Sequence, residues 1–292
     1  MSEVVAGGLS PELGEKYERL VGILADMGDL IVGMSGGVDS VLLAKVAHDV
    51  LSERALAVTA DSPSLPRREL RAAEELARQV GIPHKVIRTQ EVFDPRYAAN
   101  PQNRCYFCKT ELFTHLEALA SELGFHWIAY GENEDDRGDH RPGAQAAGEH
   151  RARAPLKEAL LTKADIRALA QHFDLPVWDK PAFACLGSRF PYGTHITPEK
   201  LAQVETAEDV LWEHGFRQYR VRYHGEVARI EVEPADMPRL VELAPQVVER
   251  FRREAGFTYV AMDLAGYRRG SMNEAPAGTI AIDELKGAPT AI

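Results

Sequence analysis

The sequence has few cysteines, no long apolar run and no surplus of basic residues. Three cysteines among 292 residues are too few, and odd in number, for a disulfide framework, which favours a reducing, cytoplasmic setting. No apolar stretch approaches the ~20 residues that span a bilayer, and the first residues lack a secretory pattern, so we expect no membrane partner. The chain has 34 lysine and arginine residues and 44 aspartate and glutamate residues, so its net charge is -10. This acidic balance disfavours nucleic-acid binding. These absences favour a small-molecule substrate.

The first two-thirds of the chain alternates short β-rich segments with helical patterns, which predicts βαβ units and a parallel sheet. The predicted strands are 29–34, 55–60, 84–89 and 126–131, and the predicted helices are 40–51, 67–81, 108–124 and 161–174. After about residue 190 the pattern changes to helix 197–216, two strands within 218–234, helix 236–254 and strand 258–266. This α-β-β-α-β order predicts a small α+β domain, and a Gly/Ala/Pro-rich tail after Asn273 is expected to be mobile.

The segment GMSGGVDSVLLAKVA follows the first predicted strand and opens a helix. The backbone N–H groups of Ser35, Gly36 and Gly37 can approach an anion closely and add to the positive end of that helix. Asp39 supplies a carboxylate that can hold Mg²⁺ against phosphates, and Ser40 supplies a hydroxyl donor. No lysine follows the glycines, so this is not a Walker A loop. We therefore predict a phosphate-binding loop of another type.

Polar residues also follow the second and fourth predicted strands, at the edge where α/β sheets bind ligands. Asp61 and Ser62 follow the second strand, where we expect adenine to be held. Gly131 and Glu132 follow the fourth strand, and Glu132 is either a ligand of metal, ribose or a reacting carbonyl, or part of a solvated acidic loop. Lys163 and Lys180 are each either a phosphate partner or an ordinary surface charge.

Several chemical roles are possible for the three cysteines. Cys105 and Cys108 lie in NRCYFCKTELF, and Cys185 lies far downstream in AFACLGSRFPYG. With a histidine such as His115 the thiols could make a four-ligand zinc site. The pair could be a redox dithiol, all three could be small buried side chains, or all three could hold an iron–sulfur cluster. Sulfur relay is a further alternative.

The string Ser-Gly-Gly-x-Asp-Ser at 35–40 resembles the signature of the PP-loop ATP pyrophosphatases, which cleave ATP to AMP and PPi while they adenylate a carboxylate or carbonyl. Three further segments resemble one branch, the ATP-dependent sacrificial sulfur transferases of the LarE type. They are KPAFACLGSRFPYGT (180–194), RVRYHGEVARIE (220–231) and MDLAGYRRGSMN (262–273). Together with RPGAQA and the loop, they extend the resemblance over nearly the whole chain.

The resemblance implies an α/β fold with two domains. Residues 1–185 would form a PP-loop, Rossmann-like parallel-sheet domain of the adenine nucleotide alpha-hydrolase type. Residues 186–292 would form a smaller C-terminal α+β domain for substrate binding and oligomerisation. Relatives of this kind suggest a homo-oligomer.

The resemblance also implies two half-reactions in the synthesis of the nickel-pincer nucleotide cofactor of lactate racemase. ATP would adenylate a carboxylate of pyridinium-3,5-biscarboxylic acid mononucleotide, and sulfur would then replace AMP to give a thiocarboxylate. By position, Asp39 would bind Mg²⁺·PPi and Glu132 would lie near the reacting carboxylate. Arg189, Arg220 and Arg222 would bind the substrate phosphate, although the two strand arginines could equally form surface salt bridges.

Glu208 and Asp263 would be acidic partners in the second domain, on a divalent metal if one is bound. In this branch one cysteine either gives up its own sulfur, or three cysteines carry a [4Fe-4S] cluster whose remaining iron holds an exogenous sulfide. Cys185 lies in the region of the sacrificial residue, whereas Cys105 and Cys108 have no use in that route. We therefore expect a cluster on the three cysteines and a sulfide donor, in addition to ATP and Mg²⁺, with sacrificial Cys185 as the alternative.

Two other functions fit parts of the sequence. A tRNA thiolation enzyme of the same superfamily also combines a PP-loop with three cysteines, but the acidic balance and the lack of a basic, aromatic-rich RNA module disfavour it. A non-catalytic nucleotide-binding sensor would bind ATP without releasing PPi.

Overall fold

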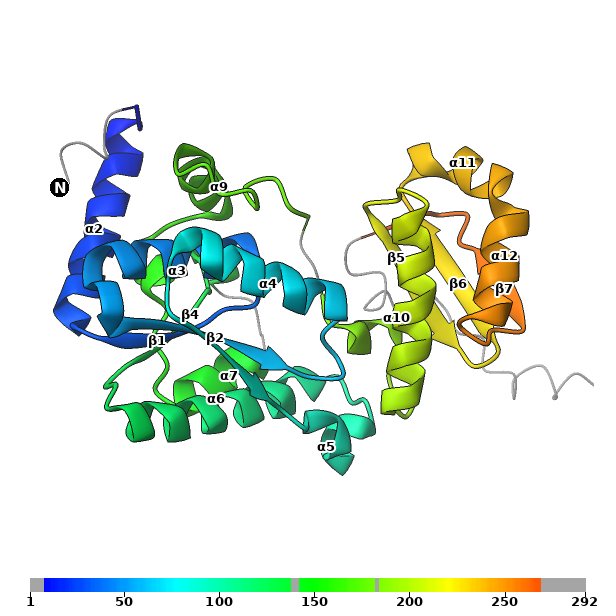
Figure 1. The fold of residues 1–292 in the computed structure, drawn as a ribbon, viewed down its shortest axis with the longest axis horizontal. Helices are drawn as coiled ribbons and strands as arrows, with labels where there is room; N and C mark the ends of the chain where they lie inside the picture. The colour runs from blue at the N-terminus through cyan, green and yellow to red at the C-terminus, as the bar shows by residue number, and fades with distance from the viewer. Residues whose placement is uncertain (1–7, 138–141, 182–183, 269–292) are drawn as a thin grey trace, which may run out of the picture.

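Figure 1 shows the computed structural model of the chain, which describes residues 8–137, 142–181 and 184–268. The tail after Asn273 and the end of the segment 262–273 lie outside the described residues. In chain order the helices, 3-10 turns (η) and strands are α2 (Pro11–Met27), β1 (Leu30–Gly33), α3 (Val38–Leu51), η1 (Ser52–Arg54), β2 (Ala55–Asp61), α4 (Arg67–Val80), β3 (His84–Arg88), η2 (Glu91–Phe93), α5 (Pro95–Ala98), α6 (Arg104–Leu123), β4 (Ile128–Tyr130), η3 (Glu134–Asp136), α7 (Pro142–Glu149), α8 (Pro155–Glu158), α9 (Lys163–His172), η4 (Leu186–Arg189), α10 (Pro198–Glu213), β5 (Tyr219–His224), β6 (Val227–Val232), η5 (Pro234–Asp236), α11 (Met237–Glu242), α12 (Ala244–Arg253) and β7 (Tyr259–Met262).

A parallel sheet with strand order β3-β2-β1-β4 carries the first part of the fold, and its four strands are the four predicted ones. Leu30 and Val32 pack into the core with α2, α3 and α9, whereas Ile31 packs with α6 on the opposite face. Figure 1 shows the same arrangement, with α3 and α4 above the sheet and α6 and α7 below it. Because both faces are covered, the strands are apolar runs without alternation.

Helix α2 is not among the predicted elements. Its start carries two ordinary signals, since the Ser10 hydroxyl accepts a hydrogen bond from the Leu13 N–H at 3.3 Å and Pro11 opens the helix. Leu20 and Leu24 are fully buried against α3 and the sheet. The helix therefore closes one side of the layer that holds the phosphate-binding loop.

Helix α6 begins at Arg104, four residues earlier than predicted. The Arg104 N–H donates to the Pro101 carbonyl at 3.0 Å, so the chain turns into the helix directly after that proline. Cys105 and Cys108 therefore lie in the first two turns, three residues apart and on one face of the helix.

The second sheet has the order β5-β6-β7, antiparallel between β5 and β6 and parallel between β6 and β7. Helices α10 and α12 pack on it around Phe216 and Phe251. The predicted α-β-β-α-β order is confirmed, except that the predicted helix 236–254 is broken into α11 and α12. Pro245 has no N–H to continue a helix and opens α12 instead.

The protein is thus an α/β protein with a parallel four-stranded sheet and a small second sheet. Within the described ranges, no helix has the length and apolar character needed to cross a membrane.

A buried ion pair joins the segment after Cys185 to the second sheet. The Arg189 side chain is 0% exposed, and its Nε and Nη2 donate to the two oxygens of Glu208 on α10 at 2.8 and 2.9 Å. Glu208 also accepts from the Val221 N–H at 3.0 Å. Burial alone would raise the pKa of Glu208, but Arg189 outweighs it and holds that pKa below its usual value.

A second pair lies beside the first. Arg222 on β5 donates to Glu231 on β6 at 2.9 and 2.7 Å and to the Ser188 carbonyl at 2.8 Å. Arg189 therefore connects η4 to α10, and Arg222 connects it to β5. Both do so through charged hydrogen bonds in the protein interior.

We predict that Arg189→Met destabilises the protein by about 3–5 kcal/mol, because it leaves the buried Glu208 carboxylate without its counter-charge. The double variant Arg189→Met/Glu208→Leu should recover at least half of that loss, since it removes the uncompensated charge and keeps the volume. Urea unfolding of wild type, both single variants and the double variant measures the coupling. Purely additive losses would contradict the assignment of this pair as a coupled buried interaction.

Candidate active site

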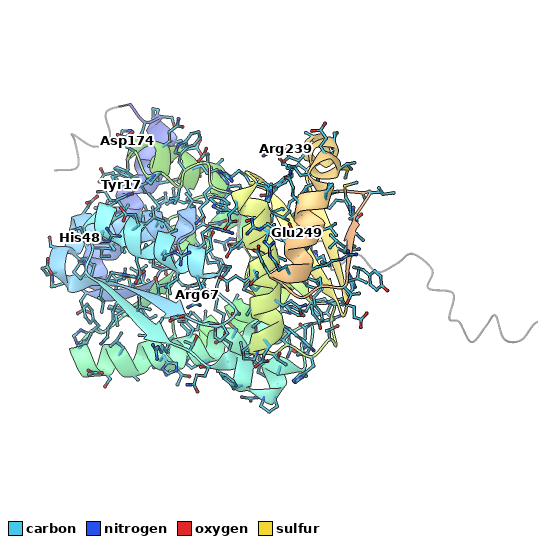
Figure 2. The ribbon with its side chains drawn as sticks, turned by 45° about the vertical axis from the view of Figure 1, so that its right-hand side comes forward. Tyr17, His48, Arg67, Asp174, Arg239 and Glu249 are labelled. Atoms are coloured by element: carbon cyan, nitrogen blue, oxygen red, sulfur yellow. The ribbon has the colours of Figure 1, made fainter. Side chains whose placement is uncertain are left out.

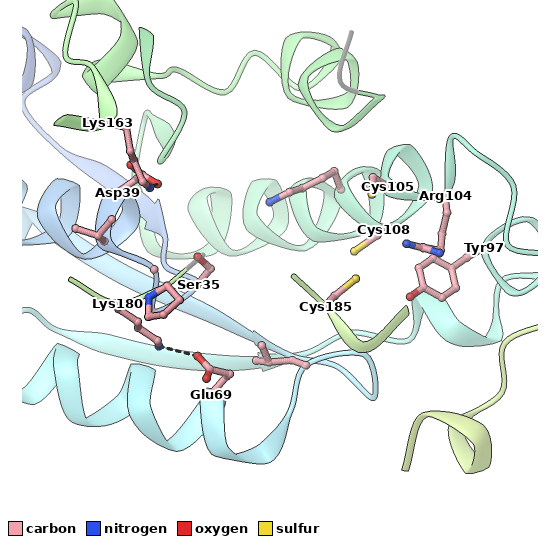
Figure 3. Close-up of a pocket in the computed structure, with 15 residues that line it drawn as sticks. Ser35, Asp39, Glu69, Tyr97, Arg104, Cys105, Cys108, Lys163, Lys180 and Cys185 are labelled. Carbon is pink, nitrogen blue, oxygen red and sulfur yellow. Dashed lines mark hydrogen bonds and ion pairs between the residues drawn. The ribbon is translucent and has the colours of Figure 1, made fainter. Parts of the chain in front are cut away.

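A cavity of about 410 Å³ lies at the carboxyl edge of the parallel sheet, where β1 passes into α3 (Figure 3). The phosphate-binding loop forms one part of its wall and the cysteines form another. The predicted site residues that line it are Ser35, Gly37, Asp39, Cys105, Cys108, Lys163 and Cys185. Residues from five separate stretches of sequence therefore meet in one cavity.

The loop before α3 is held by its own hydroxyl groups and by the close approach of the residue that follows β4. Ser40 Oγ accepts from the Ser35 N–H and donates to the Gly37 carbonyl, each at 3.1 Å. Gly36 has φ +75°, a conformation that side chains disfavour. A Cβ at Gly131, after β4, would lie 2.8 Å from the Ser40 nitrogen, so glycine is needed there for close packing.

Asp39 forms an ion pair with Lys163, the first residue of α9, at 2.5 Å. Asn133 Nδ2 donates to the other Asp39 oxygen at 3.4 Å. The Lys163 N–H in turn donates to Asp135 at 2.8 Å. The structure therefore brings together a carboxylate suited to Mg²⁺ and a lysine suited to phosphate, which here neutralise each other.

Glu132 is buried after β4 and accepts from Lys157 Nζ at 2.8 Å and from the Tyr130 hydroxyl. Burial and then the neighbouring Glu132 charge raise the pKa of Tyr130, so its hydroxyl stays a donor. Glu132 is not part of the 410 Å³ cavity wall.

Asp61 and Ser62 also lie outside that wall. Asp61 pairs with Arg67 at the start of α4, and Ser62 donates to the buried carboxylate of Glu91. Ser62 and Ser64 are 2.8 Å apart between their hydroxyl oxygens. Their predicted adenine contacts stay predictions.

Two further charged residues of the wall are Lys180, which the sequence offers as a possible phosphate partner, and Glu69, which is not among the predicted site residues. Lys180 Nζ donates to Glu69 on α4 at 2.6 Å and to the Gly36 carbonyl of the phosphate-binding loop at 3.2 Å (Figure 3). A lysine 144 residues from the loop that it contacts carries no local sign of that contact, apart from its place at the start of KPAFACLGSRFPYGT.

The three cysteines lie at the other end of the cavity, where the Cys108 and Cys185 side chains point towards each other in Figure 3. Burial raises the pKa of Cys108, with Glu91 and Cys185 as the next causes. Burial followed by the Cys185 charge also raises the pKa of Cys105, although that residue keeps exposed surface. The thiols are therefore close enough to oppose one another's ionisation.

Among the residues that the structure describes, no three His, Cys, Asp or Glu side chains form a group that could hold a metal ion. Glu208 is instead bonded to Arg189, and Asp263 pairs with Arg229 at 3.3 Å. A divalent-metal role for Glu208 and Asp263 stays a prediction.

The predicted phosphate-binding arginines gather at the second sheet rather than in the cavity wall. Arg220 donates to the Tyr219 carbonyl at 2.6 Å and its guanidinium lies 5.1 Å from the Tyr267 ring centre. Burial and then the Arg189 charge lower the pKa of Arg220. Around it, Arg189 pairs with Glu208, Arg222 with Glu231, and Arg229 with Glu231 and Asp263.

Comparison with known proteins agrees with this geometry. The NAD synthase family profile matches residues 23–106, which include the phosphate-binding loop. A tRNA-specific 2-thiouridylase of Xanthobacter autotrophicus is 34% identical over 52% of this chain and 49% of its own length. An uncharacterised protein of Synechocystis is 46% identical over 89% of this chain and 98% of its own length. The pyridinium-3,5-bisthiocarboxylic acid mononucleotide synthase of Lactiplantibacillus plantarum is 36% identical over 90% of this chain and 95% of its own. On that coverage, the chain belongs to the LarE family of PP-loop proteins.

Proposed function

We propose that the protein is an ATP-dependent sulfur transferase that converts a carboxylate of pyridinium-3,5-biscarboxylic acid mononucleotide into a thiocarboxylate. One observation carries the proposal: the phosphate-binding loop and all three cysteines line the same 410 Å³ cavity. An activated acyl group formed at the loop can then meet sulfur without leaving the protein. The name of the Lactiplantibacillus relative describes a product of the same chemistry.

The first half-reaction is adenylation. The loop 35–40 binds the ATP phosphates with its N–H groups, while Lys163 and Lys180 leave their carboxylate partners for phosphate oxygens. Asp39, once released from Lys163, holds Mg²⁺ against the pyrophosphate, and we propose Asp61 and Ser62 near adenine. A substrate carboxylate oxygen bonds to the α-phosphorus as the bond to the β-phosphate oxygen breaks, and PPi leaves.

The second half-reaction replaces AMP by sulfur. A sulfur anion at the cysteine end of the cavity bonds to the acyl carbon, and the bond from that carbon to the AMP oxygen breaks. One carboxylate oxygen therefore leaves with AMP, and sulfur takes its place. Adenylation is needed because a free carboxylate is a poor electrophile, whereas AMP is a good leaving group. Glu132, close to the loop through Gly131, is proposed to lie by the reacting carboxylate.

We propose that Cys105, Cys108 and Cys185 hold a [4Fe-4S] cluster. The donor types fit, because all three cysteines line one cavity and the iron ions of such a cluster bind cysteine thiolates. A cluster binds each thiolate at a different iron, so the sulfurs do not have to converge on a single ion. When bound, it would supply an iron without a protein ligand, to which sulfide can attach. The alternative sulfur source is Cys185 itself.

The second unit, residues 186–292, is proposed to bind the mononucleotide phosphate. Arg220, which lines a separate cavity of about 150 Å³, is proposed to contact that phosphate, and Arg189 and Arg222, each paired with a glutamate, position the surface around it. Exposed Val241, Tyr259 and Leu264 offer this unit an apolar surface for self-association as a homo-oligomer. Reducing conditions in the cytoplasm would keep the thiols available.

We predict that Asp39→Asn lowers PPi release from ATP and the pyridinium substrate by about a hundredfold or more, because a carboxylate–metal contact contributes several kcal/mol to transition-state stabilisation. Asp49→Asn is the matched control, since Asp49 lies on the same helix and also pairs with a lysine, Lys45, but at the surface. It should keep wild-type rates. Equal rates in the two variants would contradict the role of Asp39.

Absence of PPi release from wild-type protein with every carboxylated pyridinium nucleotide would instead favour the nucleotide sensor. A mobility shift with bulk tRNA at moderate salt would favour the tRNA thiolase. The similarity to the Xanthobacter 2-thiouridylase covers only 52% of this chain.

We predict that protein isolated anaerobically contains iron and acid-labile sulfide, and that Cys105→Ser, Cys108→Ser and Cys185→Ser each lose most of both. Thr114→Ala, at an exposed position on the same helix as the pair, should keep them. Absorption spectra with iron and sulfide assays provide the measurement. Colourless, iron-free wild-type protein from iron-replete cells would rule out the cluster, and a chain lighter by H₂S after turnover would then identify Cys185 as the sulfur source.

A further inference from the structure

The cysteine end of the cavity contains a buried hydroxyl that neither the sequence analysis nor the proposed function uses. Tyr97, on α5, is 1% exposed and lines the cavity beside the cysteines (Figure 3). Its Oη has no hydrogen-bond partner among the residues that the structure describes. A buried hydroxyl without a partner destabilises the folded state, so proteins seldom keep one unless a ligand satisfies it.

A buried cation lies next to this hydroxyl. Arg104, the first residue of α6, is 6% exposed, lines the same cavity and donates from Nη1 to the side chain of Asn100. Its guanidinium lies close to Cys185 and Tyr97, and one end of it points towards the cysteine sulfurs in Figure 3. Asn100 is itself fixed, because its Nδ2 donates to the Pro191 carbonyl at 2.7 Å.

The chain leaves room for this pair of donors by having glycine at position 187. A Cβ there would lie 2.7 Å from Tyr97 Oη and 3.4 Å from Arg104 Nε. The first contact is far tighter than packing allows, so a side chain at 187 would force the Tyr97 hydroxyl to shift, whereas the second is at the limit of ordinary van der Waals contact. Gly187, in η4, thus leaves the room that the Tyr97 hydroxyl occupies.

We propose that Tyr97 and Arg104 form a donor site for hydrosulfide at the cysteine end of the cavity. The site rests on the proposed function, since it holds the sulfur anion that the second half-reaction consumes. A small anion fits, because the cation of Arg104 supplies charge and the neutral hydroxyl of Tyr97 supplies a directed hydrogen bond. Three thiols in the same wall give this soft anion a polarisable surrounding that an oxygen anion would not need.

The test is a titration of sodium hydrosulfide into the anaerobic full-length protein with the metal content it carries when isolated. Binding is followed by calorimetry for wild type, Tyr97→Phe and Tyr17→Phe. Tyr17 is a matched control, a tyrosine that is 4% exposed and lies in α2, away from the cavity. We expect Tyr97→Phe to weaken hydrosulfide binding about tenfold or more, as for loss of a hydrogen bond to a charged group, and Tyr17→Phe to bind like wild type.

A second measurement separates binding from folding. Without sulfide, Tyr97→Phe should unfold at the same temperature as wild type or higher, because it removes an unpartnered buried hydroxyl. Gly187→Ala should weaken hydrosulfide binding without any change to Tyr97 or Arg104 themselves. Arg104→Lys, which keeps the charge but loses the planar set of donors, should bind hydrosulfide better than Arg104→Met.

Unchanged affinity in Tyr97→Phe, or wild-type protein that binds no hydrosulfide, overturns the proposal. PPi release by wild type distinguishes this failure from failure of the proposed function. If wild type releases PPi but Tyr97→Phe binds hydrosulfide as well as wild type, the transferase proposal stands and the donor site is wrong. If hydrosulfide binding depends on Tyr97 but no PPi is released, the donor site stands and the proposed function is wrong.

Discussion

The Arg189–Glu208 pair fixes the third cysteine relative to the other two. Besides its bonds to Glu208, the guanidinium donates to the Ala184 and Cys185 carbonyls at 2.6 and 3.1 Å. A carboxylate of α10 therefore holds, through one buried arginine, the backbone that presents Cys185 to α6. Neither ion is stable in this interior without the other, so the position of the Cys185 backbone depends on the packing of α10. A unit that contributes no part of the phosphate-binding loop thus helps to position one of the three cysteines.

Near the phosphate-binding loop, by contrast, each carboxylate is paired with a lysine that another cation could replace. Asp39 pairs with Lys163, Glu132 with Lys157, and Glu69 with Lys180. In each pair the lysine neutralises a carboxylate that would otherwise lie partly buried and uncompensated. When ATP and Mg²⁺ enter, lysine can move from carboxylate to phosphate while the metal takes its place at Asp39. Magnesium neutralises only part of the ATP charge, so the released lysines are needed to balance the phosphates.

The features that sequence could predict are those with local causes. The four strands and the glycine-rich turn that opens α3 depend on residues within a few positions of one another, and the structure has them where predicted. The start of α6 was misplaced because Arg104 gives no sign of a helix until its N–H bonds to Pro101. Glu69, Tyr97 and Arg104 were missed because their positions depend on contacts between distant elements, as in the 111-residue separation of Glu69 from Lys180. The apolar or charged character of a residue is in the sequence, but its neighbours across the cavity are not.

The charge of the cavity differs in sign from that of the protein, and this difference bears on what can enter. The chain carries a net charge of -10, yet the cavity wall has Arg104, Lys109, Lys163 and Lys180 against Asp39 and Glu69, or four cations minus two carboxylates. A small anion such as a nucleotide or hydrosulfide gains from the local field once inside, where screening by solvent is weak. An extended polyanion such as tRNA would also meet the net negative charge of the whole protein, which disfavours its binding. The charge of the cavity wall therefore favours each small anion of the proposed reaction.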